Sequence, residues 1–175
     1  MKKYIVIFTF LFFTILINPF YAFSQKMKLF KNKRDGYSIK LPDNWIFENS
    51  NPSASLDATQ PKKNGEESIL VNFGIVIEKT NGKNSVEYAK SFKATYDTTS
   101  GYTLLNTGEI NLSGIESKYY LYKMEIKTEG GIFKAEEKFY TVLKDGYAYV
   151  LICTSDNFDK AAPLFEKIIN TFKLK

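Results

Sequence analysis

The sequence of 175 residues contains no histidine and a single cysteine, Cys153. Histidine is the usual general base near neutral pH and a usual nitrogen ligand of zinc, so histidine-based catalysis and zinc sites of the His/Cys type are excluded. One cysteine cannot form a disulfide within the chain. Because Cys153 lies in the apolar run Tyr147–Cys153, where burial blocks access to a thiol, we interpret it as an inert core residue.

Signatures of other catalytic chemistry are missing as well. The sequence has no Gly-x-Ser-x-Gly elbow, no Ser-x-x-Lys signature and no glycine-rich phosphate loop. We therefore predict that the protein is not an enzyme and assign it no cofactor and no metal ligands, while a metal site built from oxygen ligands alone stays open. A hydrolase that acts through two carboxylates or through a Ser–Lys pair is the alternative.

Three pairs of acidic residues are the candidates for carboxylate chemistry, which needs two such groups at one bond. Successive strand residues point to opposite faces, so adjacent acids on a strand cannot share a site. Acids near a helix start are stabilised there, and surface carboxylates are usually solvated. We therefore interpret these acids as solvated or helix-capping residues: Glu66–Glu67, Glu136–Glu137, and Asp156 with Asp159. The run Asp156-Asn157-x-Asp159 gives only a weak calcium signal.

The charge of the chain is close to balanced. Its 24 lysines and arginines face 19 acidic residues, a net charge of +5. Lys2 and Lys3 belong to the expected leader, so the exported part carries 22 − 19 = +3, which is too small and too evenly spread to indicate nucleic-acid binding. One local exception is Lys26–Arg34, which holds five basic residues: Lys26, Lys28, Lys31, Lys33 and Arg34. Two interpretations stay open for this stretch, a solvated and mobile start of the domain, or attraction to an anionic membrane surface.

The first 24 residues have the layout of a secretory signal peptide. A positive start, Lys2-Lys3, precedes the uncharged and almost wholly apolar run Tyr4–Ile17, and Asn18-Pro19 ends any helix there. A membrane span needs about 20 apolar residues, so this run is too short to be a retained anchor. The simple, lysine-rich leader is typical of bacterial export.

Small residues mark the expected end of this leader. Ala22 and Ser24 occupy the positions that a signal peptidase reads, which predicts cleavage after Ser24 and Gln25 as the first residue of the exported protein. No cysteine lies near this point, so lipid attachment of the bacterial lipoprotein type is excluded. We expect a signal peptide over residues 1–24, a single domain over residues 25–175, and a destination in the periplasm or the medium.

The exported part has the patterns of a sheet-rich domain. Aromatic residues make up 16% of the chain and pack well on pleated surfaces. The segment Asn49–Gly65 is polar and rich in Asn, Ser, Pro and Lys, which predicts a long loop. Apolar alternation predicts strands over Tyr37–Leu41, Trp45–Phe47, Ile69–Ile77, Tyr102–Ile110, Ile115–Lys127, Ile132–Leu143 and Tyr147–Thr154. The last four strands are joined by Ser113-Gly114, Gly130-Gly131 and Asp145-Gly146, which predicts an antiparallel meander.

Both faces of this sheet are expected to be covered. The runs Tyr119–Tyr122 and Tyr147–Cys153 are apolar on both faces, whereas a sheet with one wet face alternates cleanly. Tyr147–Cys153 is therefore expected in the middle of the sheet. Helical spacing predicts one helix after Asn84 or Ser85, with the stripe Val86, Ala89, Phe92, Lys93 and Tyr96, and one after Ser155-Asp156, with Ala162, Phe165, Ile168, Ile169 and Phe172. The predicted fold class is α+β, a central antiparallel sheet covered by helices on both faces.

Tyrosines are the remaining binding candidates. Aromatic cross-strand pairs are ordinary sheet chemistry, so we interpret the strand tyrosines as stacking partners. An exposed subset would bind a sugar, a peptide or a protein, because tyrosine joins an apolar ring to a polar tip. The residues concerned are Tyr119, Tyr120, Tyr122, Tyr140, Tyr147 and Tyr149.

Two stretches resemble a known family. Asp35–Trp45 reads as a short strand, a proline-containing turn and a tryptophan, and Tyr147–Leu151 is followed by Phe158-Asp159-Lys160 and by the apolar helix that includes Pro163–Phe165 and Ile168–Phe172. This order is similar to the opening and the end of PsbP-like and DcrB-like proteins. The resemblance implies an antiparallel sheet between helices and a non-catalytic role, usually protein binding. Photosynthetic members retain metal ions, but a chain without histidine gives no basis for carrying that property over.

The predicted function is an exported, non-catalytic binding module of the bacterial cell envelope. Its expected partner is another envelope protein, with a small molecule or a sugar as the other ligand class, and no nucleic acid. A membrane-surface assembly or stress factor that uses Lys26–Arg34 is the second alternative.

Overall fold

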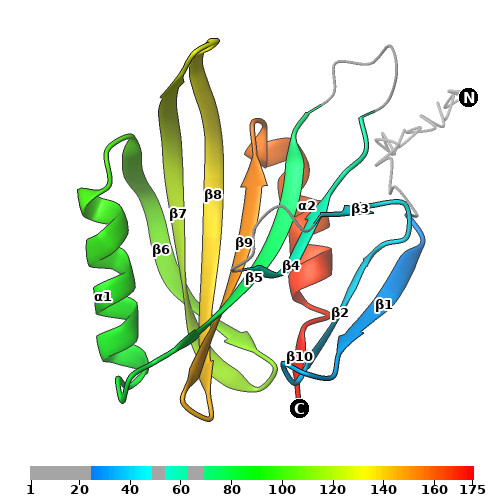
Figure 1. Ribbon diagram of the computed structural model, residues 1–175, viewed down its shortest axis with the longest axis vertical. Coiled ribbons are helices and arrows are strands. Elements are labelled where there is room, and N and C mark those ends of the chain that lie inside the picture. The colour runs from blue at the N-terminus through cyan, green and yellow to red at the C-terminus, as the bar shows by residue number, and fades with distance from the viewer. Residues whose placement is uncertain (1–24, 49–53, 63–68) are drawn as a thin grey trace, which may run out of the picture.

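The computed structural model describes residues 25–48, 54–62 and 69–175. The leader and the predicted cleavage after Ser24 lie outside the described residues, as do Glu66 and Glu67 and part of the segment Asn49–Gly65. The elements, shown in Figure 1, are β1 (Met27–Asn32), β2 (Tyr37–Pro42), β3 (Ile46–Phe47), β4 (Ala54–Thr59), β5 (Val71–Lys79), α1 (Ser85–Thr98), β6 (Tyr102–Leu112), β7 (Ile115–Thr128), β8 (Gly131–Lys144), β9 (Tyr147–Ser155), α2 (Phe158–Ile169) and β10 (Lys173–Leu174).

A seven-stranded antiparallel sheet organises the domain. Its strand order is β3-β4-β5-β9-β8-β7-β6, so the predicted meander from β6 to β9 is confirmed, and β9 occupies the centre as predicted. The β8–β9 turn has positive φ at both Asp145 and Gly146, the combination that a two-residue hairpin with matching twist requires.

A second, three-stranded sheet was not predicted. β1 and β10 both pair with β2 in the order β1-β2-β10. The basic stretch Lys26–Arg34 therefore contains a strand, paired from Met27 with Pro42 to Asn32 with Tyr37. The interpretation of this stretch as a mobile start is wrong, because backbone hydrogen bonds tie it to β2.

The predicted loop Asn49–Gly65 is also wrong in part. Its described portion contains β4, which pairs with β5 and with the short β3. The prediction failed because β4 has few large apolar residues: its inward positions are Leu56 and Ala58, and Ser55 and Asp57 lie between and beside them. Hydrogen bonding to β5 supports the strand where hydrophobic patterning is weak.

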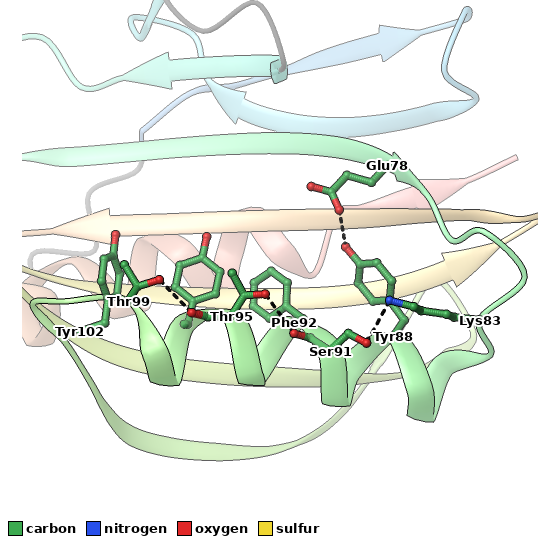
Figure 2. A pocket seen from close by; sticks show the side chains of 9 residues that line it. Glu78, Lys83, Tyr88, Ser91, Phe92, Thr95, Thr99 and Tyr102 are labelled. Carbon is green, nitrogen blue, oxygen red and sulfur yellow. Dashed lines mark hydrogen bonds between the residues drawn. The ribbon is translucent and has the colours of Figure 1, made fainter.

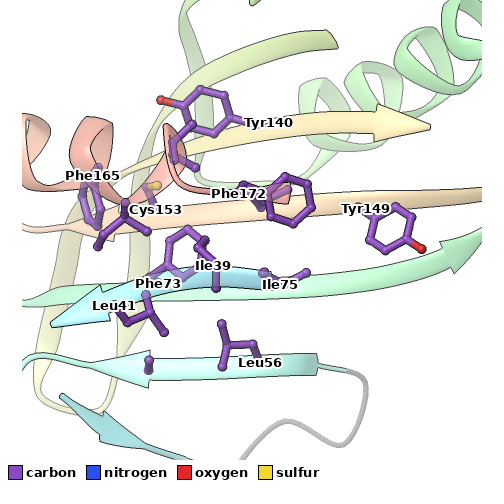
Figure 3. Packing of buried hydrophobic residues seen from close by; sticks show 14 of the residues in the cluster. Ile39, Leu41, Leu56, Phe73, Ile75, Tyr140, Tyr149, Cys153, Phe165 and Phe172 are labelled. Carbon is purple, nitrogen blue, oxygen red and sulfur yellow. The ribbon is translucent and has the colours of Figure 1, made fainter. Parts of the chain in front are cut away.

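The larger core lies between the seven-stranded sheet on one side and α2 with the three-stranded sheet on the other. Tyr149, Leu151 and Cys153 of β9 point into this core, and Figure 3 shows Phe165 of α2 and the nearby Phe172 packing toward them. From β2, Tyr37, Ile39 and Leu41 join the same cluster. The central antiparallel sheet is confirmed, but sheet dominates the domain, and β2 shares with α2 a cover that was predicted to be helical.

The smaller core lies on the opposite face of β9. Ala148 and Val150, which alternate with the residues above, pack with Tyr120, Tyr122 and Phe139 against α1. α1 begins with a capping box between Asn84 and Glu87, which satisfies backbone amides at its first turn. The described residues contain no helix that is long and apolar enough to span a membrane.

The predicted stripe of α1 was correct only in part. Val86 is 66% exposed, whereas Tyr88 and Ala89 are the buried residues of the helix, and Phe92 and Tyr96 pack beside them. The predicted stripe began at Val86, whereas the residues that face the sheet follow the four-residue spacing of Tyr88, Phe92 and Tyr96. These aromatic residues face the sheet because their large rings bury more area.

Candidate binding site beneath helix α1

An aromatic wall is the first component of the site. Tyr88, Phe92 and Tyr96 lie one turn apart on α1, and Tyr102 follows at the start of β6. The ring centroids are 4.8 Å apart between Phe92 and Tyr96 and 5.2 Å apart between Tyr96 and Tyr102, with the second pair edge to face. Such spacing is favourable for aromatic pairs, so the four side chains form one continuous surface.

A pocket of about 500 Å³ opens along this wall. We call it the α1 pocket, and Figure 2 shows its side chains between the helix and strand β5. Its size lies within the range of about 300–1,000 Å³ that ligand sites occupy. The lining residues are Glu78, Lys83, Tyr88, Ser91, Phe92, Thr95, Tyr96, Thr99 and Tyr102.

Carboxylates stand near the two ends of the α1 pocket, each bonded to a tyrosine. The Tyr88 hydroxyl donates to Glu78 Oε2 at 2.9 Å, and the Tyr102 hydroxyl donates to Glu137 Oε2 at 3.0 Å. Burial and the neighbouring carboxylate raise the pKa of both tyrosines, so each stays a neutral donor.

Tyr96 lies between these two carboxylates. Burial, followed by the charges of Glu137 and Glu78, raises the pKa of Tyr96 to about 12. Both carboxylates disfavour ionisation of this one hydroxyl, so it stays a neutral hydrogen-bonding group.

Glu137 is an acid whose pKa is raised above its ordinary value. Burial raises its pKa, while hydrogen bonds from Thr154 at 3.0 Å and from Tyr102 lower it in part. The prediction that Glu136 and Glu137 face opposite sides is confirmed, since Glu137 is paired with Tyr122 of the α1 face and Glu136 is paired with Lys123. The solvated role that we assigned to Glu137 is wrong, because its side chain is partly buried and both of its carboxylate oxygens accept hydrogen bonds, from Tyr102 and Thr154.

A row of polar residues continues from Glu137 across the sheet. Thr59, Asn72, Thr154 and Glu137 occupy paired positions on β4, β5, β9 and β8. Asn72 donates to Asp57 at 2.8 Å and to Thr59 at 2.9 Å. We call these residues the polar row; it lies on the same face as the α1 pocket.

The predicted stacking among strand tyrosines is confirmed for one pair, Tyr119 and Tyr140, and the six residues are divided between the two faces. Tyr119 and Tyr140 are register partners 6.2 Å apart on the larger-core side, with the Lys138 ammonium 4.3 Å from the Tyr119 ring centre. Tyr120 and Tyr122 belong to the smaller core. Of the six, Tyr147 is exposed, and Tyr149 packs in the larger core.

The site residues Tyr88, Tyr102 and Glu78 were missed by sequence reasoning. The spacing of Tyr88, Phe92 and Tyr96 at four-residue intervals is the signal that could have found the helical part. Nothing local marks Glu78, which reaches the pocket because β5 pairs with β9 in the register of Glu78 with Ala148.

The remaining candidates have structural roles. Cys153 is fully buried, and burial raises its pKa, as expected of an inert core thiol. Asp156 accepts a hydrogen bond from the Leu70 amide at 2.8 Å, and Asn157 caps α2 through the amide of Lys160. Within the described ranges, no group of three or more His, Cys, Asp or Glu side chains is placed to hold a metal ion.

A Ser–Lys pair does occur in the α1 pocket, where Lys83 Nζ lies 3.0 Å from Ser91 Oγ. A lysine that acts as a general base is desolvated, whereas Lys83 is exposed. The pair therefore lacks the burial that Ser–Lys catalysis requires and is explained as a contact between the β5–α1 loop and the helix.

Comparisons with known proteins agree on the fold. Neither a known protein family nor a curated protein matches the sequence. Among solved structures, the chain is similar to the cyanobacterial PsbP protein CyanoP of Synechocystis, with 15% identity, a TM-score of 0.58, and coverage of 86% of this chain and 94% of that one.

Two further structures extend this likeness. LpqN of Mycobacterium tuberculosis, involved in cell envelope biogenesis, shows 12% identity and a TM-score of 0.57 over 86% of this chain and 91% of its own. The Ran-binding protein Mog1p of Saccharomyces cerevisiae shows 10% identity and a TM-score of 0.59 over 86% of this chain and 96% of its own. Identity this low shows the fold alone; the chain has the PsbP-like fold that its sequence resemblance predicts.

Proposed function

We propose that the protein is an exported, non-catalytic binding module of the cell envelope whose α1 pocket holds a segment of a protein partner. The observation that carries the proposal is the combination of aromatic rings and carboxylates on a partly covered face. Tyrosine is enriched in protein interfaces because its ring is apolar and its tip is polar. The Ran-binding role of Mog1p and the envelope role of LpqN support a binding function.

Site-specific photo-crosslinking in the native host tests this proposal. A benzoylphenylalanine at Thr95, in the pocket, is expected to capture one partner protein. The same group at Lys33, an exposed position near the three-stranded sheet, is the matched control and is expected to capture none. No adduct at Thr95, or the same adducts at both positions, would contradict the proposal.

Export is tested separately, on the protein recovered from cells. The proposal expects an exported product that begins at Gln25, because Ala22 and Ser24 are the small residues of the cleavage site. Amino-terminal sequencing of the extracytoplasmic fraction checks this. A product that keeps residues 1–24, or one confined to the cytoplasm, would overturn export while leaving the binding proposal untouched.

The membrane-surface alternative has its own observation. The outer face of the three-stranded sheet brings Lys31, Lys40 and Lys173 together around Leu29, since Leu29 pairs with Lys40, and Lys31 and Lys173 both pair with Ser38. These cations come from both ends of the chain. Co-sedimentation with phosphatidylglycerol vesicles at low salt, lost in the variant Lys31→Gln/Lys40→Gln, would favour this alternative.

A further inference from the structure

Four strands that form the sheet side of the α1 pocket and the polar row beside it carry charge of one sign on this face. On the face that α1 shares, the strand residues of β4, β5, β8 and β9 include Asp57, Glu78 and Glu137, and among the described residues of these strands none on this face is lysine or arginine. Lys83 is the basic residue that lines the pocket, and its ammonium is hydrogen-bonded to Ser91. The lining itself holds one acid, Glu78, and one base, Lys83, and the further acids, Glu137 and Asp57, lie beside the pocket on the sheet.

The aromatic wall strengthens this preference. The faces of tyrosine and phenylalanine rings carry partial negative charge and attract cations within about 6 Å. Phe92, Tyr96 and Tyr102 present such rings along the pocket, and Glu78 supplies a full negative charge at one end.

The two residues that carry the carboxylates stand well apart along the sheet, so a single side chain reaches only one of them. Glu78 pairs with Ala148, and Glu137 pairs with Thr154, six residues further along β9. At a rise of about 3.3 Å for each strand residue, this corresponds to roughly 20 Å. Between them, the Tyr96 hydroxyl makes no hydrogen bond within the described part of the chain.

We propose that the α1 pocket receives a lysine or arginine side chain of the partner protein. This inference rests on the proposed function and specifies the chemistry of the bound segment. The apolar stem of the side chain lies along Phe92 and Tyr96, and its charged group faces Glu78 or, past Tyr102, Glu137. A long amphipathic side chain matches a pocket that combines aromatic rings with hydroxyl groups and has a carboxylate near each end. An anion is repelled by the carboxylates, and a purely apolar group leaves them without a cationic partner.

The test is an NMR titration in which N-acetyl-lysine methylamide or N-acetyl-arginine methylamide is added to the protein. The protein is expressed with its own leader. The ring signals of Tyr88, Tyr96 and Tyr102 are followed. The neutral, isosteric norleucine compound is the control ligand. Saturable shifts with the cationic compounds, weakened by salt, and at least about fivefold weaker binding of the norleucine compound are expected.

Paired variants locate the effect. Glu78→Gln/Glu137→Gln is expected to lower the affinity for the lysine compound by about fivefold. Glu136→Gln, on the opposite face, is expected to leave it unchanged. Equal binding of the norleucine compound, or no shifts at all, would overturn the inference.

The two proposals fail separately. If crosslinking at Thr95 succeeds while the titration is negative, the pocket binds a protein by other chemistry. If the titration is positive, spermidine displaces the lysine compound from the pocket, and no protein crosslinks at Thr95, the ligand is a small cation. That result overturns the proposal of a protein partner. A negative result in both experiments removes the α1 pocket as a binding site.

Discussion

Gly101 fixes the corner between α1 and β6, and its replacement by alanine gives the sharpest test of how the α1 pocket is positioned. Its φ is +89°, a backbone conformation that residues with a Cβ rarely adopt. A Cβ built there would lie against the Glu125 carbonyl oxygen, well inside the 3.0 Å that real Cβ contacts essentially never cross. The Gly101 carbonyl also accepts a hydrogen bond from the Glu125 amide at 2.8 Å, which holds Tyr102 against β7.

The expected magnitude has two parts. The left-handed conformation costs a residue with a Cβ roughly 1–2 kcal/mol relative to glycine. Crowding against a backbone atom that cannot rotate away adds about 1–3 kcal/mol. Gly101→Ala is therefore expected to lower the free energy of unfolding by roughly 2–5 kcal/mol.

Gly82→Ala is the matched control. Gly82 also has a positive φ, +80°, but a Cβ there would meet no atom within 4 Å. Its replacement is expected to cost only the conformational part, about 1–2 kcal/mol. The smaller entropy of the unfolded chain after a glycine-to-alanine change affects both variants, so it cancels in their difference.

Urea unfolding followed by circular dichroism measures both variants against the original protein. The difference between Gly101→Ala and Gly82→Ala reports the clash with Glu125 alone. In thermal melts, each kcal/mol corresponds to about 2–4 °C for a chain of this size. Equal destabilisation of the two variants would refute the argument, because it would mean that the Gly101 corner relaxes without resistance from β7.

Three further predictions concern single side chains. Tyr102→Phe removes the hydroxyl that donates to Glu137 and is expected to cost about 1 kcal/mol in urea unfolding, whereas Tyr147→Phe, at an exposed residue, is expected to cost nothing measurable. Because burial raises the pKa of Glu137, the native state holds the Glu137 proton more readily than the unfolded state does. The free energy of unfolding should therefore fall as the pH rises from the unfolded pKa through the native pKa. Glu137→Gln should remove this pH dependence in unfolding curves measured in parallel. The Cys153 thiol should resist a thiol reagent in the native protein and react at once in urea, and fast native labelling would contradict its burial.

Much of the fold could be predicted because the relevant signals are local. Dipeptides such as Asp145-Gly146 mark the hairpin turns from β6 to β9. The apolar residues on both faces of β9 identified it as the central strand. β4 could not be predicted in this way, because its strand character depends on pairing with β5 rather than on its own residues.

The opening motif that carries the family resemblance serves the structure. The Tyr149 hydroxyl donates to the Asp35 carbonyl at 3.0 Å, and the Asp35 carboxylate accepts hydrogen bonds from Ser55 and Asn32. Asp35 therefore connects the three-stranded sheet, β4 and the central strand β9. This explains why the motif predicted the fold well and gave no information about the pocket, which uses none of these residues.

The α1 pocket follows from the geometry of the covers. A helix is about 10 Å across and strands are about 4.8 Å apart, so one helix covers roughly two strands of a sheet. On the larger-core face, α2 shares the task with β2. On the other face α1 has no such companion among the described elements and packs chiefly on β6, β7 and β8. Tyr88, Tyr96 and Tyr102 extend this cover with rings that end in hydroxyls, and beyond them the sheet surface becomes polar at Asn72 and Thr154. This face of the sheet therefore buries its aliphatic residues under α1 and keeps hydroxyl donors and carboxylates at the surface. A binding site requires that combination.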